Sequence, residues 1–288
     1  ATMNELDISK PLTVPELKRM AVQMRKDILY MIYEAQAGHP GGSLSATDIV
    51  TALYFRLMRL NPANPEWEDR DRFILSKGHA CPVWYAALAN RGFYDRAHLS
   101  TLRKLNSILQ GHADMKKTPG VDMTVGSLGQ GICAGVGMAL GARYLHKDYH
   151  VWVVIGDGEM QEGSVWEAAM SAAKWNLDNL TVILDLNRIQ NDDFVEKTMP
   201  LGQVKEKWQA FGWNTISING HDMQQVVDAL EEARTIKGIP TIIIADTIKG
   251  KGVSFMENVP AWHGTAPNAD QYAQALADVE SVLLEVHA

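Results

Sequence analysis

The chain has 288 residues, of which 46% are hydrophobic and 21% charged, a balance typical of a globular protein with a large buried core. Its formal net charge of −7 argues against nucleic-acid binding, which needs clustered lysine and arginine. No apolar stretch approaches the roughly 18 to 20 residues that span a bilayer. Because no secretory signal pattern is visible and the two cysteines form no framework, we expect a reducing, cytoplasmic setting.

The first half of the sequence predicts helices. Apolar residues recur at helical spacing in several segments, and the first of these follows a predicted capping box of Thr13 and Glu16. The expected helices span residues 14–34, 46–60, 80–90, 98–105 and 129–145. In the last of them, close helix packing explains Gly135, Gly137 and Gly141 better than a ligand-binding loop does.

In the second half, predicted strands alternate with predicted helices. Short apolar runs that end at turns are typical of buried parallel strands, and they cover residues 151–155, 181–184, 215–218 and 241–245. Helical patterns cover residues 164–175, 204–211, 223–235 and 270–287. The alternation predicts a single α/β domain over residues 1–288, with a mostly parallel sheet and helices on both faces.

Two of the predicted strands run into side chains that carry oxygen. The strand at 151–155 leads into Asp157, which lies between two glycines, and the strand at 181–184 leads into Asn187. Ligands bind beyond the carboxyl ends of such strands, and neighbouring strands lie only about 4.8 Å apart. Carboxylate and amide oxygens suit Mg²⁺ or Ca²⁺, and Mg²⁺ completes its shell with phosphate and water oxygens. The sequence therefore predicts a site for a metal and a diphosphate.

Four histidines stand in glycine-containing segments, which let the backbone turn and the imidazole project into a cleft. They are His39, His79, His112 and His263. A fifth, His221, also follows a glycine. Because Asp222 behind it predicts a helix N-cap, we expect His221 to be structural.

Four motifs occur in the order found in transketolases. They are His39-Pro-Gly-Gly-Ser-Leu-Ser, Ser76-Lys-Gly-His79-Ala, Gly126-Ser-Leu-Gly-Gln-Gly131 and Gly156-Asp-Gly-Glu-Met-Gln-Glu-Gly163. The chain resembles that family from about residue 16 to residue 268. The resemblance implies the thiamine-diphosphate-binding fold, known as the PP domain, with thiamine diphosphate as cofactor. It also implies Mg²⁺ as the metal, with Ca²⁺ or Mn²⁺ able to replace it.

The resemblance also implies roles for individual residues. Asp157, the Asn187 side chain and the main-chain carbonyl of Ile189 are expected to hold the metal. The expected cofactor contacts are His79, His112, Gly126, Leu128, Gly158, Glu159, Asn187 and His263. The expected catalytic residues, which move protons to and from substrate hydroxyls or stand beside the diphosphate, are His39, His112 and His263. The family commonly has a second asparagine where this chain has Arg188.

Full-length transketolases resemble this sequence only in their first half. By that resemblance, the pyrimidine-binding and C-terminal domains are expected on a partner chain, the transketolase C-terminal subunit, in a heterotetramer. The implied reaction moves a two-carbon ketol unit from a ketose phosphate to an aldose acceptor. It would serve the pentose phosphate pathway or a specialised catabolic one.

Three other interpretations stay open. A different thiamine-diphosphate enzyme, similar to deoxyxylulose-phosphate synthase or to a 2-oxoacid dehydrogenase α subunit, is compatible with Lys249-Gly250-Lys251-Gly252, although the four histidines favour transketolase over the dehydrogenase. A non-catalytic subunit would have lost cleft residues that are present here. A nicotinamide-dependent enzyme is disfavoured, because Asp157 would repel a metal-free pyrophosphate and the glycines from Gly126 onward lack the dinucleotide order.

Overall fold

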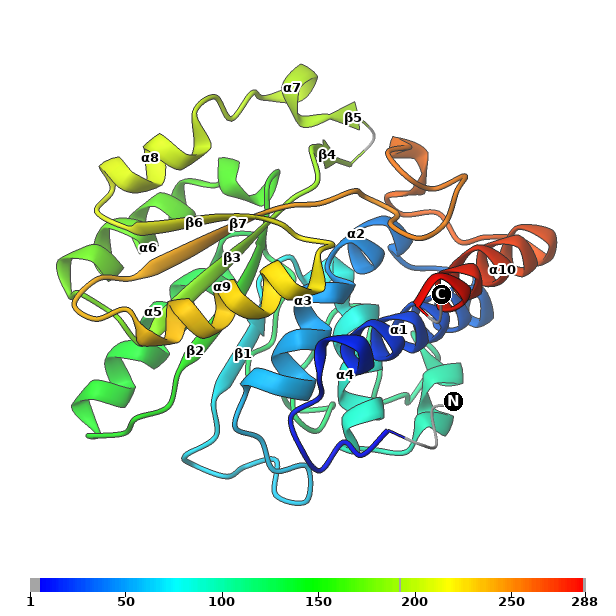
Figure 1. Ribbon diagram of the computed structural model, residues 1–288, viewed down its shortest axis with the longest axis horizontal. Helices are drawn as coiled ribbons and strands as arrows, with labels where there is room; N and C mark the ends of the chain where they lie inside the picture. Colours follow the sequence, from blue (N-terminus) through cyan, green and yellow to red (C-terminus); the bar gives the residue numbers. More distant parts are fainter. Residues whose placement is uncertain (1–5, 192, 287–288) are drawn as a thin grey trace.

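A parallel β-sheet forms the centre of the protein in a computed structural model that describes residues 6–191 and 193–286, with side chains up to residue 282. The sheet has five strands in the order β1-β2-β3-β7-β6, and every neighbouring pair is parallel (Figure 1). The strands are β1 (Arg72–Leu75), β2 (Val151–Gly156), β3 (Leu180–Leu186), β6 (Asn214–Asn219) and β7 (Thr241–Asp246). The predicted α/β class with a mostly parallel sheet is confirmed.

Burial explains which strands the sequence shows clearly. All six residues of β2 are buried, and the same holds for nearly all of β3, because both strands are covered on two faces. Every residue of the edge strand β6 is half-buried or exposed, and its sequence is a mixture of polar and apolar residues. Strand β1 is a short run of four residues, and the sequence analysis missed it.

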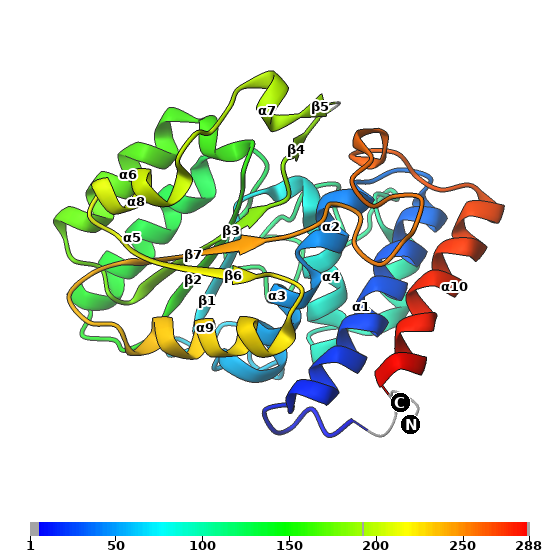
Figure 2. The ribbon, with the colours of Figure 1, turned by 45° about the horizontal axis from the view of Figure 1, so that its top comes forward.

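Helices cover both faces of the sheet (Figure 2). One face carries α5 (Gln130–Tyr144), α6 (Gly163–Lys174) and α8 (Val204–Ala210), and α9 (Met223–Thr235) packs on the other. Beside α9 lies a group of helices formed by α1 (Val14–Ala35), α3 (Thr47–Ala52), α4 (Cys81–Arg91) and α10 (Ala269–Val286). Every helix among the described residues is too short or too polar to cross a membrane.

The helix predicted at residues 46–60 is largely confirmed, but it ends three residues early. The structure has α3 followed directly by a π-helical turn at Leu53–Leu57, and a short helix that was not predicted, α2 (Pro40–Ser45), precedes them. Hydroxyl groups of Ser43, Thr47 and Thr51 donate to carbonyl oxygens four residues earlier, at 2.7 to 2.9 Å, a pattern that bends helices. One residue, Ala46, separates α2 from α3, and α2 begins at Pro40, a residue suited to the first turn.

Smaller elements complete the chain. The helix predicted at 98–105 is a 3₁₀ helix at Arg96–Thr101, and residue 287 of the last predicted helix lies outside the described residues. The sequence analysis also missed a hairpin of β4 (Ile189–Gln190) and β5 (Asp193–Phe194). Short helical turns occur at Gly78–Ala80, Glu159–Gln161, Val195–Thr198 (α7) and Pro260–Trp262.

The glycines of α5 divide into two kinds. A Cβ atom on Gly135 would stand 2.6 Å from the Val153 side chain, so this glycine brings α5 close to β2, as predicted. Gly137 and Gly141 have no atom within 4 Å of an added Cβ among the described residues. The prediction that these two serve close packing inside the chain is therefore wrong.

Candidate active site

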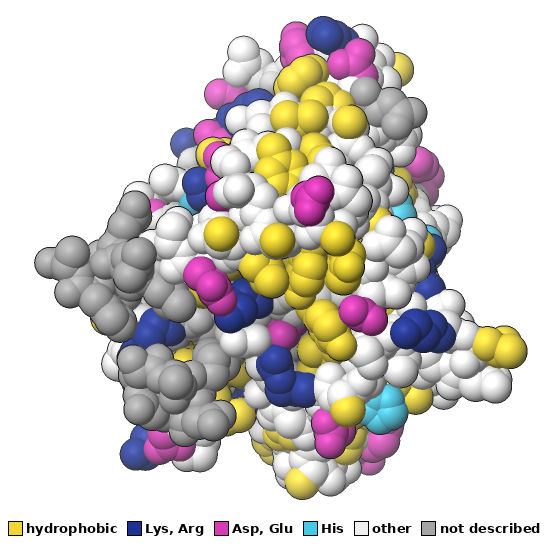
Figure 3. Space-filling model, turned by 90° about the vertical axis from the view of Figure 1, so that its right-hand side faces the viewer, with side chains coloured by type: hydrophobic (Ala, Val, Ile, Leu, Met, Phe, Trp, Pro, Cys, Tyr) yellow, Lys and Arg dark blue, Asp and Glu magenta, His cyan; other side chains and the backbone are white. Residues whose placement is uncertain are grey.

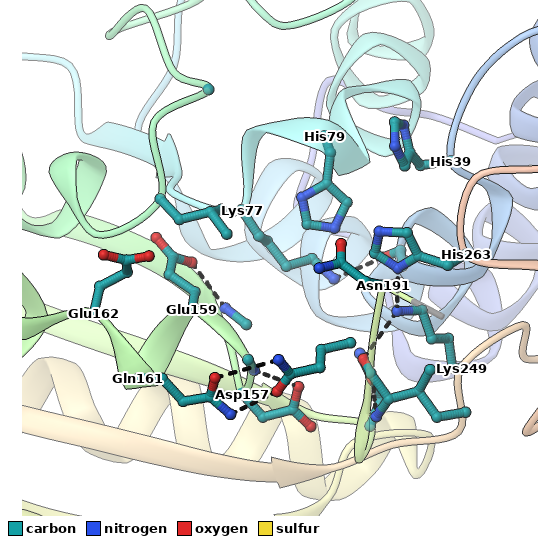
Figure 4. A pocket seen from close by; sticks show the side chains of 18 residues that line it. His39, Lys77, His79, Asp157, Glu159, Gln161, Glu162, Asn191, Lys249 and His263 are labelled. Atoms are coloured by element: carbon teal, nitrogen blue, oxygen red, sulfur yellow. Dashed lines mark hydrogen bonds between the residues drawn. The ribbon is translucent and has the colours of Figure 1, made fainter. Parts of the chain in front are cut away.

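A cavity of about 330 Å³ opens at the carboxyl ends of β2 and β3. Its walls come from segments far apart in the sequence: the start of α2, the turn before α4, the loop before α5, the β2 and β3 ends, and the loops after β7. Figure 4 shows His39, His79 and His263 grouped together, with Asp157 further along the same cavity. Of the predicted site residues, every one except His112 lines this cavity.

The predicted metal ligands meet at one end of the cavity. The Asp157 carboxylate accepts hydrogen bonds from the backbone amides of Gly158, at 2.8 Å, and Arg188. The Asn187 side-chain oxygen accepts from the Ile189 amide at 3.1 Å, which folds residues 187–189 into a tight turn. The turn directs the Ile189 carbonyl oxygen toward the cavity, where it accepts from the Lys249 ammonium at 2.9 Å.

This oxygen set fits a magnesium ion that also binds a diphosphate. Among the described residues no group of three or more His, Cys, Asp or Glu could hold a metal. One carboxylate, one amide and one carbonyl leave other positions for phosphate and water oxygens, which is how Mg²⁺ is usually bound. Burial, and then the nearby Asp185 carboxylate, raise the pKa of Asp157 to about 6, so a cation here would relieve an unfavourable pair.

Three of the four predicted histidines form a cluster. The ring centroids of His39, His79 and His263 lie 5.1 to 5.3 Å apart. Burial and then neighbouring cations lower the pKa of His39 to about 4 and that of His263 to about 3, and burial likewise lowers the pKa of His79. All three rings are therefore neutral near pH 7 and can accept as well as donate hydrogen bonds.

The tautomer of His263 follows from its partner. Its Nδ1 atom lies 2.6 Å from the Lys249 ammonium, which has only donors. Nδ1 must be the acceptor, so the proton of the neutral ring is on Nε2. His39 is different, because its Nδ1 atom is buried and has no hydrogen-bond partner among the described residues. An unpaired polar atom of this kind fits a cavity whose ligand supplies the missing hydrogen bond.

His112 lies outside the cluster. Its side chain is exposed, and its Cδ2 atom would lie 3.5 Å from a Cβ atom added to Gly126, a residue of the cavity wall. His112 therefore stands at the rim of the cavity, next to a residue of its wall.

The Glu159 carboxylate is hydrogen-bonded to three segments of the site. Its buried carboxylate accepts from the Gly129 amide at 2.9 Å, from the Gly156 amide at 3.0 Å and from the Ser76 hydroxyl. These bonds join the ends of β1 and β2 to the first turn of α5. Glu159 was predicted to contact the cofactor, and the structure shows a carboxylate that is already occupied by protein donors.

Two buried lysines were missed by the sequence analysis. Lys77 and Lys249 are each 2% exposed, and both line the cavity. Lys77 donates to the Gly42 carbonyl at 2.8 Å and forms an ion pair with Asp185. Burial, and then the charge of Lys77, lower the pKa of Lys249 to about 8. The sequence did contain a signal for both lysines. Lys77 lies inside one of the four recognised motifs, and Lys249 lies in a glycine-rich turn that follows a strand.

Comparisons with known proteins agree with this geometry. The family described as "Transketolase, thiamine diphosphate binding domain" matches residues 17–279. The chain is 44% identical over 265 residues to 6-deoxy-6-sulfo-D-fructose transketolase subunit SqwG of Clostridium sp. (strain MSTE9), covering 92% of this chain and 96% of that protein. It is 40% identical to an apulose-4-phosphate transketolase subunit of Phocaeicola vulgatus, covering 92% of this chain and 94% of that protein.

The solved structures show the same relationship. The crystal structure of transketolase from Campylobacter jejuni superimposes with a TM-score of 0.88 at 32% sequence identity. That match covers 93% of this chain and 43% of the other, so this chain spans less than half of that transketolase. The chain thus belongs to the transketolase family of ketol-transferring enzymes, as a protein built on the thiamine-diphosphate-binding domain.

Proposed function

We propose that this chain binds thiamine diphosphate with Mg²⁺ and, together with a companion subunit, transfers a two-carbon ketol unit between sugars. The observation that carries this proposal is the meeting of Asp157, Asn187 and the Ile189 carbonyl in one cavity with three neutral histidines. Asp157, Asn187 and Ile189 would hold the metal, and Ca²⁺ or Mn²⁺ could take its place because the ligands are hard oxygens.

The cations of the cavity would receive the diphosphate. Lys249 lies beside the predicted metal ligands, since its ammonium binds the Ile189 carbonyl. If the Ile189 carbonyl held the metal instead, the Lys249 ammonium would be available to pair with phosphate oxygens. His79, His263 and the backbone at Gly158 would complete the phosphate contacts, and Gly126 and Leu128 would meet the aminopyrimidine ring.

Bound thiamine diphosphate supplies a carbon nucleophile and an electron sink. The chain's own residues orient the cofactor and handle protons. Both His39 and His263 are neutral. His39, whose Nδ1 atom has no partner among the described residues, can accept or return the proton of a substrate hydroxyl, whereas His263, whose Nδ1 atom is bonded to Lys249, can donate a hydrogen bond from Nε2. His112 at the rim would serve the part of the substrate furthest from the metal.

A partner chain is supported by two observations. The relatives that match this chain over nearly their whole length are named as subunits. The outward side of α5 and α6 also exposes large apolar side chains, among them Tyr144 at 85% and Met170 at 55%. Gly137 and Gly141 leave open space on the same helix α5, which suits the close approach of another chain. We infer that this α5–α6 face packs against the companion subunit or a second copy in a heterotetramer.

The substrates would be sugars that carry an anionic group. One relative is named for 6-deoxy-6-sulfo-D-fructose and another for apulose-4-phosphate. These names favour a specialised sugar-phosphate or sugar-sulfonate transketolase over a general enzyme of the pentose phosphate pathway.

Calorimetric titration tests the proposal. Thiamine diphosphate is titrated into the chain co-purified with its companion, with and without Mg²⁺. We expect Mg²⁺-dependent binding that Asp157→Ala abolishes, whereas Asp228→Ala, a change at an exposed helix position, leaves it intact. Equal binding in the absence of metal, or by the Asp157→Ala protein, would refute the metal assignment. Ketol transfer is then measured with phosphorylated and sulfonated ketoses.

A further inference from the structure

A second cavity, of about 510 Å³, lies outside the active site between α1, α10 and the loops that follow β6 and β7. None of the residues that line it lines the first cavity. Figure 3 shows the face formed by α1 and α10, where apolar side chains gather in a band with lysine or arginine side chains beside it. The cavity is therefore a separate feature with a mixed apolar and basic character.

Its floor is a buried network of charged and polar groups. Arg25 binds the Asp48 carboxylate through both terminal nitrogens, at 3.1 and 2.7 Å, and His221 binds the same carboxylate at 2.8 Å. These three side chains are only 9 to 11% exposed. Burial alone would raise the pKa of Asp48, but Arg25 and His221 outweigh it and hold that pKa below its ordinary value.

One N–H group of this network has no acceptor among the described residues. The Ile248 amide donates to His221 Nε2 at 2.8 Å, so the neutral ring carries its proton on Nδ1 and donates it to Asp48. Arg25 also donates to the carbonyls of Lys251 and Leu44. Of its five N–H groups, one on Nη1 has no acceptor among residues 6–191 and 193–286. Buried donors of this kind usually meet an acceptor.

The rim adds positive charge and the walls are apolar. Lys18 forms no ion pair with any described residue, and Lys251 pairs with Glu257 at 3.3 Å. The lining thus holds three cations, counting Arg25, and one carboxylate. Val22 and Val279, both nearly buried, form part of the apolar wall.

We propose that this second cavity binds a small organic anion, whose carboxylate or phosphate group lies between Lys18, Lys251 and Arg25 and whose short hydrocarbon body lies against the valines. Such a ligand matches both the basic groups and the apolar wall of the cavity. An inorganic anion would leave the apolar wall exposed to water, and a neutral apolar molecule would leave the N–H donors without acceptors. The proposal does not depend on the function of the first cavity.

The test uses saturation-transfer NMR on the whole chain with isobutyl phosphate, isobutyrate, isobutanol and inorganic phosphate as probes. Mg²⁺ and pyrophosphate are present in excess, so that the first cavity is filled. We expect isobutyl phosphate or isobutyrate to bind more tightly than isobutanol and inorganic phosphate. Lys18→Gln and Lys251→Gln should each weaken that binding by about fivefold, the effect of one exposed ion pair.

Lys26→Gln is the matched control, since Lys26 lies on the same helix, pairs with Glu280 and does not line the cavity. It should leave binding unchanged. Equal binding of isobutanol and isobutyl phosphate would overturn the proposal, and so would unchanged affinity in both the Lys18→Gln and Lys251→Gln proteins. A probe signal that appears only when Mg²⁺ and pyrophosphate are left out would assign the probe to the first cavity instead and would also overturn the proposal.

Discussion

Lys77 and Asp185 form an ion pair beneath the active-site cavity that is almost closed to solvent, with side chains 2% and 0% exposed. The Asp185 carboxylate also accepts from Ser45 at 2.6 Å and from the Thr247 hydroxyl. It thereby connects α2, the turn after β1, the end of β3 and the segment after β7. Desolvation makes such a pair a weak source of stability, but removal of one member leaves a buried charge without a partner.

The first prediction concerns this pair. Asp185→Ala should lower the free energy of unfolding by about 3 to 5 kcal/mol, because Lys77 keeps its charge in a closed site. The double variant Lys77→Met/Asp185→Leu should lose clearly less. Urea denaturation of the wild-type protein and both variants measures these differences. A double variant no more stable than the single one would show that the pair contributes beyond its mutual charge compensation.

The second prediction concerns the turn that carries the predicted metal ligands. Arg188 has a left-handed backbone, with φ of 68°, its amide binds Asp157, and its guanidinium binds Asp246 at 2.6 and 3.0 Å. The Arg188–Asp246 pair is exposed, so Asp246→Ala should cost at most about 1 kcal/mol of stability. It should nevertheless raise the Mg²⁺ concentration needed for cofactor binding, because the turn is held less firmly.

Asp148→Ala is the matched control for that experiment. Asp148 is the exposed partner of another arginine, Arg59, and it precedes the amino end of β2, whereas Asp157 follows the carboxyl end of that strand. Its removal should leave the Mg²⁺ dependence unchanged. If both variants behaved like the wild-type protein in Mg²⁺ titrations monitored by cofactor binding, Arg188 would have no part in positioning Asp157.

The third prediction concerns acid stability. Burial, followed by the charges of Arg234 and Lys237, lowers the pKa of His150 to about 3, whereas an unfolded histidine has a pKa of about 6.5. Below pH 6.5 the unfolded chain binds a proton at this histidine that the folded chain does not bind. The contribution of neutral His150 to the free energy of unfolding is therefore complete above that pH and is lost as the pH falls toward 3. At pH 5 the loss from this residue is about 2 kcal/mol.

His150→Gln keeps a polar group near Thr181, which the ring contacts at 2.8 Å, but removes the titration. Relative to the wild-type protein, the variant should therefore gain about 2 kcal/mol between pH 8 and pH 5. Denaturant unfolding at both pH values measures this change. Parallel pH profiles for the two proteins would argue against a neutral buried His150.

The fourth prediction compares two glycines of one helix. Gly135→Ala should destabilise the chain by about 1 to 3 kcal/mol, because its Cβ would stand 2.6 Å from Val153. Gly137→Ala has open space and should stabilise the isolated chain by about 0.5 to 1 kcal/mol, since alanine favours helices. Urea denaturation of the isolated chain decides both, and effects of the same sign would contradict the packing of α5.

The sequence by itself determined the α/β class and the place of the predicted metal ligands. Both follow from local rules. Continuous apolar runs such as Val151–Gly156 mark buried strands, and polar residues just after such a run, such as Asp157 and Asn187, must emerge at the same edge of a parallel sheet. The recognised motifs then supplied the family, because several short patterns in a fixed order are far more specific than any one of them.

Only the tertiary structure decided which side chains meet. Lys77 and Asp185 are 108 positions apart, and Glu159 reaches Ser76 across 83, so no local pattern links them. The same is true of the histidines, which look alike in sequence although three cluster and His112 stands at the rim. The short helix α2 and its interruption at Ala46 were likewise not predicted, and hydroxyl groups on both sides of Ala46 bond to backbone carbonyls there. Contacts of this kind depend on the path of the whole chain, which periodicity and turn chemistry do not encode.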